Sequence, residues 1–299
     1  MSGVRSRQEK TIAAIGHILM IIAAILALAP FWLLVSSSIQ SDSSITRDGY
    51  AFLPKEISWS AYQYLFSEWK QIGRAYLVTI MTTVIGTTAS LFLVSMTSYV
   101  LAIKDLPGRT VIFIAILLTM LLNGGQVAMY ITYSRVVDVR NTIFALLVPN
   151  LLLNGFNVML VRNYVANSIP SELQEAASID GAGLFRIYVQ IILPLSKPIL
   201  ATVGLLTALG YWNDWINGLY FVNDSKWYSI QLLLNQINSS AQYLASHSDQ
   251  LGQMASQIEI PTVSIRMAIS VLVIVPIVIA YPFFQKYFTG GIMVGAVKG

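Results

Sequence analysis

The segment from Ala75 to Ile103 contains no Asp, Glu, Lys, Arg or His. An α-helix rises about 1.5 Å per residue, so roughly 20 apolar residues cross the ~30 Å hydrocarbon core of a bilayer. This segment is long enough to span a membrane and too apolar to cover the surface of a soluble domain. The sequence therefore predicts an integral membrane protein.

The composition of the whole chain also favours lipid as its solvent. Of the 299 residues, 56% are hydrophobic and only 11% are charged, whereas a soluble domain carries about 25% charge. The absence of cysteine excludes disulfides and thiolate zinc sites. The net charge of +4 is too small and too dispersed for a protein that binds nucleic acid.

Six stretches are long and apolar enough to cross a membrane, which predicts an all-α membrane protein with six transmembrane helices. They are 12–35, 75–103, 110–133, 142–161, 199–222 and 262–285. The fourth is interrupted by Asn150, Asn154 and Asn157. We expect these amides to face other helices or a wet path rather than lipid.

The positions of Lys and Arg predict that both termini are cytoplasmic. Ten of the 18 Lys and Arg then fall on the cytoplasmic side and eight outside, and the flanks nearest the spans agree. The expected organisation is an N-terminal tail over 1–11, a six-helix domain over 12–289 and a C-terminal tail over 290–299. The six-helix domain includes a long cytoplasmic loop over 162–198.

The sequence lacks the residue patterns of an enzyme that acts alone. His17 and His247 lie at opposite ends of the chain, without metal-ligand spacing. No G-x-x-x-x-G-K-[ST] phosphate loop and no G-x-S-x-G motif occurs. We therefore expect no catalytic residue, no metal and no cofactor bound by this chain.

The loop over 162–198 predicts a hairpin of two short helices. Ser171 and Gln174 have the spacing of a capping box at the start of the first helix. Gly181 supplies a left-handed stop at its end. After the second helix, Pro194 and Pro198 break the chain before the fifth span.

Small and apolar side chains along this hairpin suit a docking protein. Ala176 and Ala177 give the first helix a slim face, and Leu184 and Phe185 start the second. Glu175 has two possible roles, because it can pair with a partner's arginine or favour the positive end of its own helix.

The spacing in this hairpin resembles the signature of permease subunits of ABC importers. Glu175-Ala-Ala, three residues, Gly181, nine residues and Ile191-x-Leu193-Pro194 reproduce the pattern E-A-A-x3-G-x9-I-x-L-P. An ordinary amphipathic hairpin has no need of this spacing. The match also lies in a loop that the count of Lys and Arg places in the cytoplasm.

Two further segments resemble the carbohydrate-uptake (MalG-like) permeases. They are Gly-Tyr-Trp-Asn-Asp-Trp-Ile-Asn over 210–217 and the ending over 290–299. The longer ending over 281–299 is most similar to the LplC/YtcP-type permeases, which are often associated with uptake of oligosaccharides or polysaccharide fragments.

The resemblance implies the type I importer (MetI-like) fold and a five-part assembly in the bacterial cell membrane. This chain would form half of the translocation path, as a heterodimer with a second permease. Two ATPase subunits would bind ATP and Mg, and an extracytoplasmic solute-binding protein would deliver the sugar. The implied contacts with the ATPase are Glu175, Ala176, Ala177, Asp180, Gly181, Leu184, Phe185 and Pro194.

The C-terminal tail is a second implied contact with the ATPase subunits. In the family this tail reaches between them, which here would place Gly295, Val297 and Lys298 at the contact. The alternative is an ordinary disordered end.

A cluster in the fifth span has the residue types of a sugar path. Aromatic rings stack on sugar C–H faces, and amides or carboxylates bond sugar hydroxyls. The alternative is an interfacial aromatic belt with a structural carboxylate. The cluster comprises Trp212, Asn213, Asp214, Trp215, Asn217 and Tyr220.

Three other functions stay open at this point. A permease for a non-sugar solute shares the hairpin signature. A secondary transporter usually shows paired broken helices or inverted repeats, and neither is evident in the sequence. A structural membrane scaffold has no need of the hairpin spacing.

Overall fold

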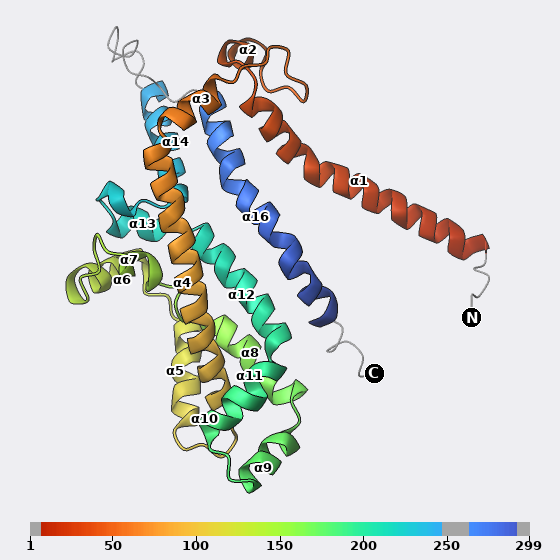
Figure 1. Cartoon of the computed structure of the whole chain (residues 1–299), viewed down its shortest axis with the longest axis vertical. Coiled ribbons are helices and arrows are strands. Elements are labelled where there is room, and N and C mark those ends of the chain that lie inside the picture. Colours follow the sequence, from red (N-terminus) through yellow and green to blue (C-terminus); the bar gives the residue numbers. More distant parts are fainter. Residues whose placement is uncertain (1–6, 247–262, 292–299) are drawn as a thin grey trace. The chain divides into compact units, whose positions relative to one another are not determined.

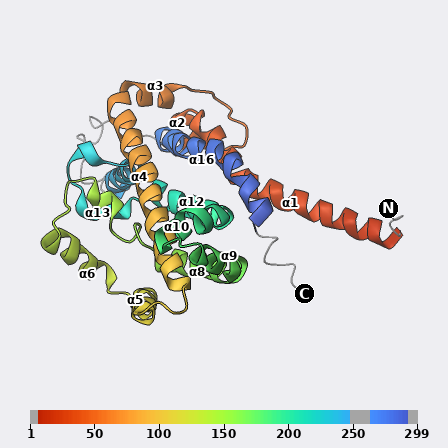
Figure 2. The same cartoon turned by 60° about the horizontal axis from the view of Figure 1, so that its bottom comes forward.

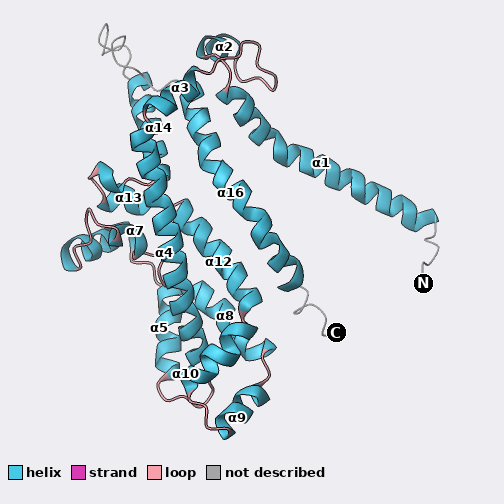
Figure 3. Cartoon of the chain, viewed as in Figure 1, coloured by secondary structure: helices cyan, strands magenta, loops and turns pink. Residues whose placement is uncertain are grey.

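The computed structural model describes residues 7–246 and 263–291, which are helical and connected by loops (Figure 1). In these ranges the only strand-like pairing is an isolated bridge between Gln40 and Ile57, so Figure 3 shows helices and loops only. The chain forms two compact units. The first comprises 1–69 and 236–275, and the second comprises 70–235 and 276–299.

The first unit contains three helices before residue 69 and the start of the last helix. They are α1 (Arg7–Ser38), α2 (Asp42–Asp48), α3 (Ser60–Ser67) and α16 (Val263–Gly291). The Asp42 carboxylate joins the two ends of this unit, because it accepts hydrogen bonds from the Ser264 backbone N–H at 3.1 Å and from its hydroxyl at 2.8 Å. None of the residues in the most hydrophobic part of α1 is buried within the chain. This helix can therefore contact lipid or a partner.

An exposed charge cluster ties α2 to the loop that follows it. Arg47 lies 3.0 Å from Glu56 and 3.4 Å from Asp48, and Lys55 lies 3.3 Å from Asp48. The hydrogen bond from Arg47, followed by that from Lys55, holds the pKa of Asp48 below its ordinary value. Hydrogen bonds from Ser41 and then Arg47 lower the pKa of Glu56.

The second unit is built around one long helix, α4 (Trp69–Ala102), which belongs to this unit from Lys70 on. Short helices, α8, α10 and α12 among them, lie beside α4 in both views (Figures 1 and 2). The helices of this unit up to residue 221 are α5 (Arg109–Leu121), α6 (Gly125–Ile131), α7 (Phe144–Leu147), α8 (Gly155–Ser168), α9 (Ser171–Ile179), α10 (Leu184–Ile187), α11 (Leu193–Leu195), α12 (Lys197–Trp212) and α13 (Ile216–Phe221). Three shorter turns are η1 (Thr132–Val136), η2 (Tyr188–Ile192) and η3 (Ser225–Trp227). The helix α14 (Ile230–Ser246) follows them and belongs to this unit up to Asn235 and to the first unit from Gln236.

Small polar residues on α4 allow its neighbours to approach closely. The Thr79 hydroxyl oxygen accepts a hydrogen bond from the Ile230 backbone N–H at 2.9 Å. The Ser98 hydroxyl donates to the Val158 carbonyl at 2.9 Å, which joins α4 to α8. A Cβ at position 86 would overlap the ring of Tyr211 on α12, so glycine is required there.

The main apolar core of this unit lies where α4, α5, α8, α12 and the hairpin over 171–195 meet. Its buried members are Val94, Tyr99, Leu101, Ile116, Val158, Val161, Val165, Ile169, Ile187, Tyr188, Ile192 and Val203. Because Ile187, Tyr188 and Ile192 of the 171–195 hairpin are buried in this core, the second half of the hairpin is packed onto the bundle.

Three of the described helical segments are long and apolar enough to cross a membrane: Thr11–Ser38, Trp69–Ala102 and Val263–Phe283. A fourth span results if Leu184–Leu195 and Lys197–Trp212, which are bent by 79°, count as one. The first, second and sixth apolar stretches thus form the long helices that the sequence predicts. The total of six transmembrane helices, and the side on which the termini lie, stay predictions.

The third and fourth apolar stretches do not form single continuous helices. The third is interrupted after α5, where Leu122 is extended and Gly125 has φ +77°. The fourth is interrupted between α7 and α8, where Asn150 has φ +62° and the Asn154 side chain caps α8. Hydropathy reports burial in lipid and does not report these backbone breaks, which glycine and asparagine permit.

The fifth stretch is also divided. The helix α12 ends at Trp212 and α13 begins at Ile216. The residues between them belong to the cluster that the sequence singles out as a possible sugar path.

Candidate functional site: the 171–195 hairpin

The hairpin begins with the short helix α9, as the sequence predicts, but without the predicted capping box. Pro170 occupies the position before the helix, with φ −60° and ψ 132°, and no side chain caps the helix start. Ser171 is already the first helical residue, so its hydroxyl lies within the first turn. Glu172 lies in that first turn, where the helix dipole favours a negative charge.

The turn at Gly181 is confirmed. Gly181 has φ +80°, a left-handed conformation that costs other residues about 1–2 kcal/mol. The Gly181 backbone N–H donates to the Ser178 carbonyl at 3.0 Å, and the Ala182 N–H donates to the Ala177 carbonyl at 2.9 Å. This geometry closes α9 and reverses the chain into α10.

The tip of the hairpin presents apolar side chains to its surroundings. The exposed fractions are 86% for Ile179, 66% for Phe185 and 52% for Leu184. The surrounding residues Glu175, Ala176, Asp180, Gly181 and Pro194 are also exposed. A face of this kind on a well-packed segment marks a surface for a protein partner.

Two residues of this surface differ from the sequence-based prediction. Ala177 is only half-exposed, because it packs against the main core. Ile179 was missed, although it has the largest exposed fraction of the large apolar side chains on the hairpin. Ile179 could have been identified from the sequence, because it is a large apolar residue directly before the turn at Gly181, where side chains are expected to face water.

The turn η2 of the hairpin is anchored to α4. The Tyr188 and Ser95 hydroxyl oxygens lie 2.6 Å apart. The Tyr188 ring also stacks on Tyr99 with ring centroids 5.8 Å apart. A small apolar groove of about 190 Å³ lies at this contact and is lined by Met96, Tyr99, Val100, Leu184, Phe185 and Tyr188.

A second, polar pocket of about 580 Å³ lies at the start of α9. Lys104 and Asp105, from the loop after α4, line it together with Glu172 and Glu175. Three carboxylates outnumber the one ammonium group at this pocket, which suits a partner that brings positive charge.

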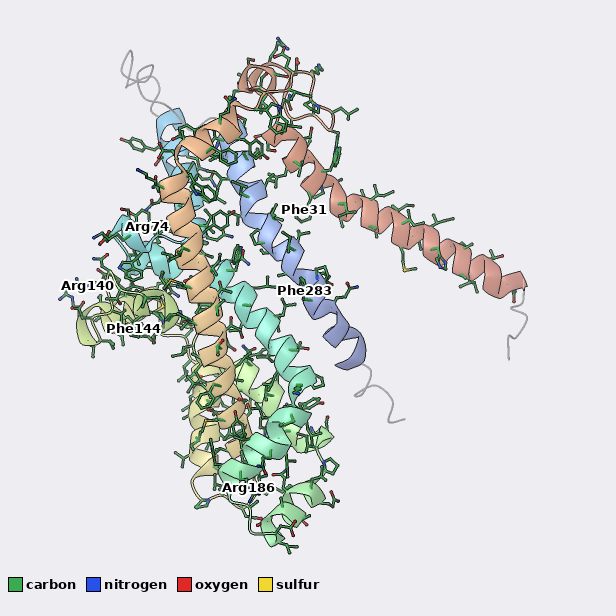
Figure 4. The ribbon with its side chains drawn as sticks, viewed as in Figure 1. Phe31, Arg74, Arg140, Phe144, Arg186 and Phe283 are labelled. Atoms are coloured by element: carbon green, nitrogen blue, oxygen red, sulfur yellow. The ribbon has the colours of Figure 1, made fainter. Side chains whose placement is uncertain are left out.

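The hairpin leads into α12 through a sharp bend. The turn η2 is π-helical, and the axis of 184–195 meets that of α12 at 79°. Ser196 lies at the bend and is buried. Figure 4 labels Arg186, which lies on the α10 end of this arrangement. The predicted break near Pro194 and Pro198 is therefore confirmed.

The residues of the possible sugar path are brought together, and most of their polar groups bond to the protein itself, although one Asp214 carboxylate oxygen is buried without a hydrogen-bond partner among the described residues. The Asp214 carboxylate accepts from the Asn217 backbone N–H at 3.2 Å. The Asn217 amide donates to the Pro149 carbonyl at 3.0 Å. Asn213 donates to the Leu209 carbonyl and accepts from Gln231, both at 2.9 Å.

The aromatic residues of this cluster divide into two kinds. Trp212 is buried, and its ring centroid lies 6.5 Å from that of Tyr76. Trp215 and Tyr220 are 36% and 39% exposed. Trp212, although buried, also lines an apolar pocket of about 350 Å³.

Other predicted contacts fall outside what the structure describes. Gly295, Val297 and Lys298, the tail residues, lie outside the described residues, and so does His247. In the ranges 7–246 and 263–291, no group of three His, Asp or Glu is placed to hold a metal ion.

Comparison with known proteins gives consistent relatives. A family model described as "Binding-protein-dependent transport system inner membrane component" matches residues 11–294. The polygalacturonan/rhamnogalacturonan transport system permease protein YtcP of Bacillus subtilis is 34% identical over 92% of this chain and 94% of its own length. Protein LplC of the same organism is 31% identical over 92% of this chain and 90% of its own length.

A solved structure shares the fold. A chain of a bacterial ABC transporter involved in the import of the acidic polysaccharide alginate superposes with a TM-score of 0.78. The two chains are 30% identical, and the match covers 96% of this chain and 100% of that chain.

Proposed function

Because this chain belongs to the family of binding-protein-dependent transport system inner membrane components, we propose that it is a carbohydrate permease of a bacterial ABC importer. The family is one of membrane permeases, so the chain is a transport protein rather than an enzyme. Relatives that transport polygalacturonan/rhamnogalacturonan, arabino-oligosaccharides and the melibiose/raffinose/stachyose group support a sugar as the solute.

The proposed assembly contains this chain, a second permease, two ATPase subunits and an external solute-binding protein. ATP and Mg would be bound by the ATPase subunits, and this chain would bind no cofactor. The chain would cross the membrane six times with both termini in the cytoplasm, and the 171–195 hairpin would then face the ATPase.

The single observation that carries the coupling role is the two-sided hairpin. Ile179, Leu184 and Phe185 are exposed at its tip, whereas Ile187, Tyr188 and Ile192 are buried against the bundle. A partner bound at the tip can therefore move the helices behind it. Closure of the ATPase dimer on ATP would draw the two hairpins of the permease pair together and open the path outwards.

A test of this coupling uses the assembled complex in proteoliposomes. We expect Ile179→Ser and Phe185→Ser to reduce copurification of the ATPase, because each removes apolar area from the contact. Phe66→Ser is the matched control, since Phe66 is 73% exposed on α3. Retention of the ATPase by both hairpin variants, together with normal uptake, would contradict the role of the hairpin.

Two alternatives are decided by uptake measurements. An importer of a non-sugar solute would show ATP hydrolysis stimulated by its binding protein, but no uptake of oligosaccharides. A secondary transporter would accumulate solute when this chain is reconstituted without any ATPase. The proposed function requires saccharide uptake that needs both the binding protein and ATP.

A further inference from the structure

The backbone is not helical in the middle of the third apolar stretch. The helix α5 ends at Leu121, and Leu122 follows with φ −104° and ψ 117°. The chain resumes as α6 only at Gly125. Non-helical backbone at membrane depth is tolerated where it is buried in protein or lines a water-filled cavity, and not where it faces lipid. With the six proposed spans, this break lies at membrane depth and therefore faces either a partner or water.

A cavity of about 730 Å³ lies at this break. Its wall is formed by the end of α5, by α6, by the π-helical turn η1 and by Asn150 from the segment before α8. Pockets for small molecules have volumes of roughly 300–1,000 Å³. The cavity is therefore large enough for a small ligand and much larger than a gap between two side chains.

Three amide side chains line the cavity, those of Asn123, Gln126 and Asn150. Gln126 is exposed, and the hydrogen bonds of the described part of the chain do not engage its amide. The Asn123 oxygen accepts from the Gly125 backbone N–H at 2.9 Å, and the Asn150 amide donates to the Met129 sulfur at 2.8 Å. Each amide keeps groups that can donate to or accept from a ligand.

The rest of the wall has the complementary apolar character. Tyr133 and Met129 line the cavity and are half-buried. The Tyr133 ring lies edge-on to Phe221, with ring centroids 6.1 Å apart, which fixes its orientation. None of the lining residues carries a formal charge. A fixed ring beside neutral amides suits a ligand with C–H faces and hydroxyl edges.

Backbone strain concentrates at the same place. Asn150 has φ +62°, a conformation that costs a residue with a side chain about 1–3 kcal/mol and that is frequent at binding sites. π-Helical turns such as η1 are also frequent at functional sites. Figure 4 shows the neighbouring Arg140 and Phe144 on the segment between η1 and α8.

We propose that this cavity is a saccharide-contact site on the translocation path, formed by this subunit itself. The inference rests on the proposed function and adds a location and a chemistry to it. The amides of Asn123, Gln126 and Asn150 would bond sugar hydroxyls, and Tyr133 would cover a C–H face. Lipid is a poor occupant because it would leave the Gln126 amide, and the remaining donors and acceptors of Asn123 and Asn150, without partners.

Accessibility to water is tested first. The chain contains no cysteine, so Asn123→Cys and Gln126→Cys introduce single thiols into the complete complex, with partner subunits that also lack cysteine. The probe is a membrane-impermeant methanethiosulfonate reagent. We expect both thiols to react in at least one nucleotide state. The control is Ile114→Cys, because Ile114 is 49% exposed on α5 but does not line the cavity, and it should not react.

The recognition of sugar is tested with Gln126→Ala. We expect the uptake rate at saturating binding protein to fall roughly three- to tenfold, the effect of about one lost hydrogen bond, while ATP hydrolysis stimulated by the binding protein persists. The saccharides are raffinose, arabinotriose and trigalacturonate. Gln63→Ala on α3 is the matched control, since Gln63 is also an exposed amide.

The possible failures are distinguishable. If Asn123→Cys and Gln126→Cys are unreactive in every nucleotide state, a partner's side chains fill the cavity and the proposal is wrong. If the wild-type complex transports one of the saccharides and Gln126→Ala transports it equally well, only the saccharide-contact site is wrong. If the wild-type complex transports no saccharide and the thiols react, the proposed function fails as well.

Discussion

The Tyr188 and Ser95 hydroxyl oxygens lie 2.6 Å apart, and this hydrogen bond joins the hairpin to the long helix α4. Both residues are buried, at 3% and 4% exposed. The contact adjoins the exposed Phe185, whose ring centroid lies 6.2 Å from that of Tyr188. It is therefore placed to transmit movement of the hairpin to the bundle.

The first prediction concerns this hydrogen bond. Tyr188→Phe keeps the ring and removes the hydroxyl, so it should destabilise the protein by about 1 kcal/mol. We expect the ATPase still to copurify, and the amount of solute transported per ATP hydrolysed to decrease. Tyr99→Phe is the matched control, because Tyr99 stacks on the same ring. Equal transport ratios in the two variants would argue against a coupling role for the hydroxyl.

The second prediction concerns the turn at Gly181. A β-branched residue is strained at φ +80°, so Gly181→Val should distort the hairpin and abolish uptake while the permease pair still assembles. Gly183→Ala is the control, because Gly183 has φ −71° and a Cβ there meets no other atom. Uptake and size-exclusion profiles of both variants provide the measurement. Unchanged ATP-coupled uptake by Gly181→Val would refute the requirement for this turn.

The third prediction separates structural from exposed residues in the 212–220 cluster. Asn217→Ala removes one of the two hydrogen bonds to the buried Pro149 carbonyl, which also accepts from the Leu151 backbone N–H at 2.8 Å. This loss should cost about 0.5–1.5 kcal/mol and lower the thermal unfolding temperature. Trp215→Ala removes an exposed ring and should leave that temperature nearly unchanged. If Trp215 lines the sugar path, its loss lowers uptake. Equal thermal stability of Asn217→Ala and wild type would remove the structural role of this amide.

The fourth prediction concerns the exposed cluster of Arg47, Asp48, Lys55 and Glu56. The pKa of Asp48 and that of Glu56 are lowered in the folded state, from ordinary values of 3.8 and 4.5. Their contribution to stability is therefore fully present above pH 4.5 and is lost as the pH falls through the lowered values. In Glu56→Gln, the thermal unfolding temperature should therefore fall less steeply with decreasing pH than in the wild type. If the unfolding temperature of the variant falls as steeply as that of the wild type, Glu56 makes no contribution to the pH dependence of stability.

The hairpin was predictable because its determinants are local. Gly181 permits the left-handed turn, Pro194 and Pro198 accompany the bend, and the spacing between them is fixed by sequence. The absence of the capping box could not be predicted. Ser171 has the right residue type and spacing for it, but it lies one position inside the helix. Capping depends on which residue leaves the helical conformation, and here Pro170 does so.

The breaks in the third and fourth apolar stretches could not be predicted from hydropathy. Leu121 and Leu122 are as apolar as their neighbours, yet the helix ends between them. The pair Gly124–Gly125 and the sequence Pro149–Asn150 were available signals, but such residues also occur within continuous transmembrane helices. The hydrogen-bond partner of an amide side chain could not be predicted either. The Asn217 amide donates to the Pro149 carbonyl, which lies 68 residues away in the sequence.

The 79° bend at Ser196 has a geometrical consequence for any motion that starts at the hairpin. Two helices joined nearly at a right angle cannot both move along their own axes when one of them is displaced. A thrust along the axis of 184–195 would instead swing α12 sideways about Ser196, and the swing is largest at its distant end, near Trp212. A small shift beneath the bilayer would thus become a larger excursion far from where the force is applied.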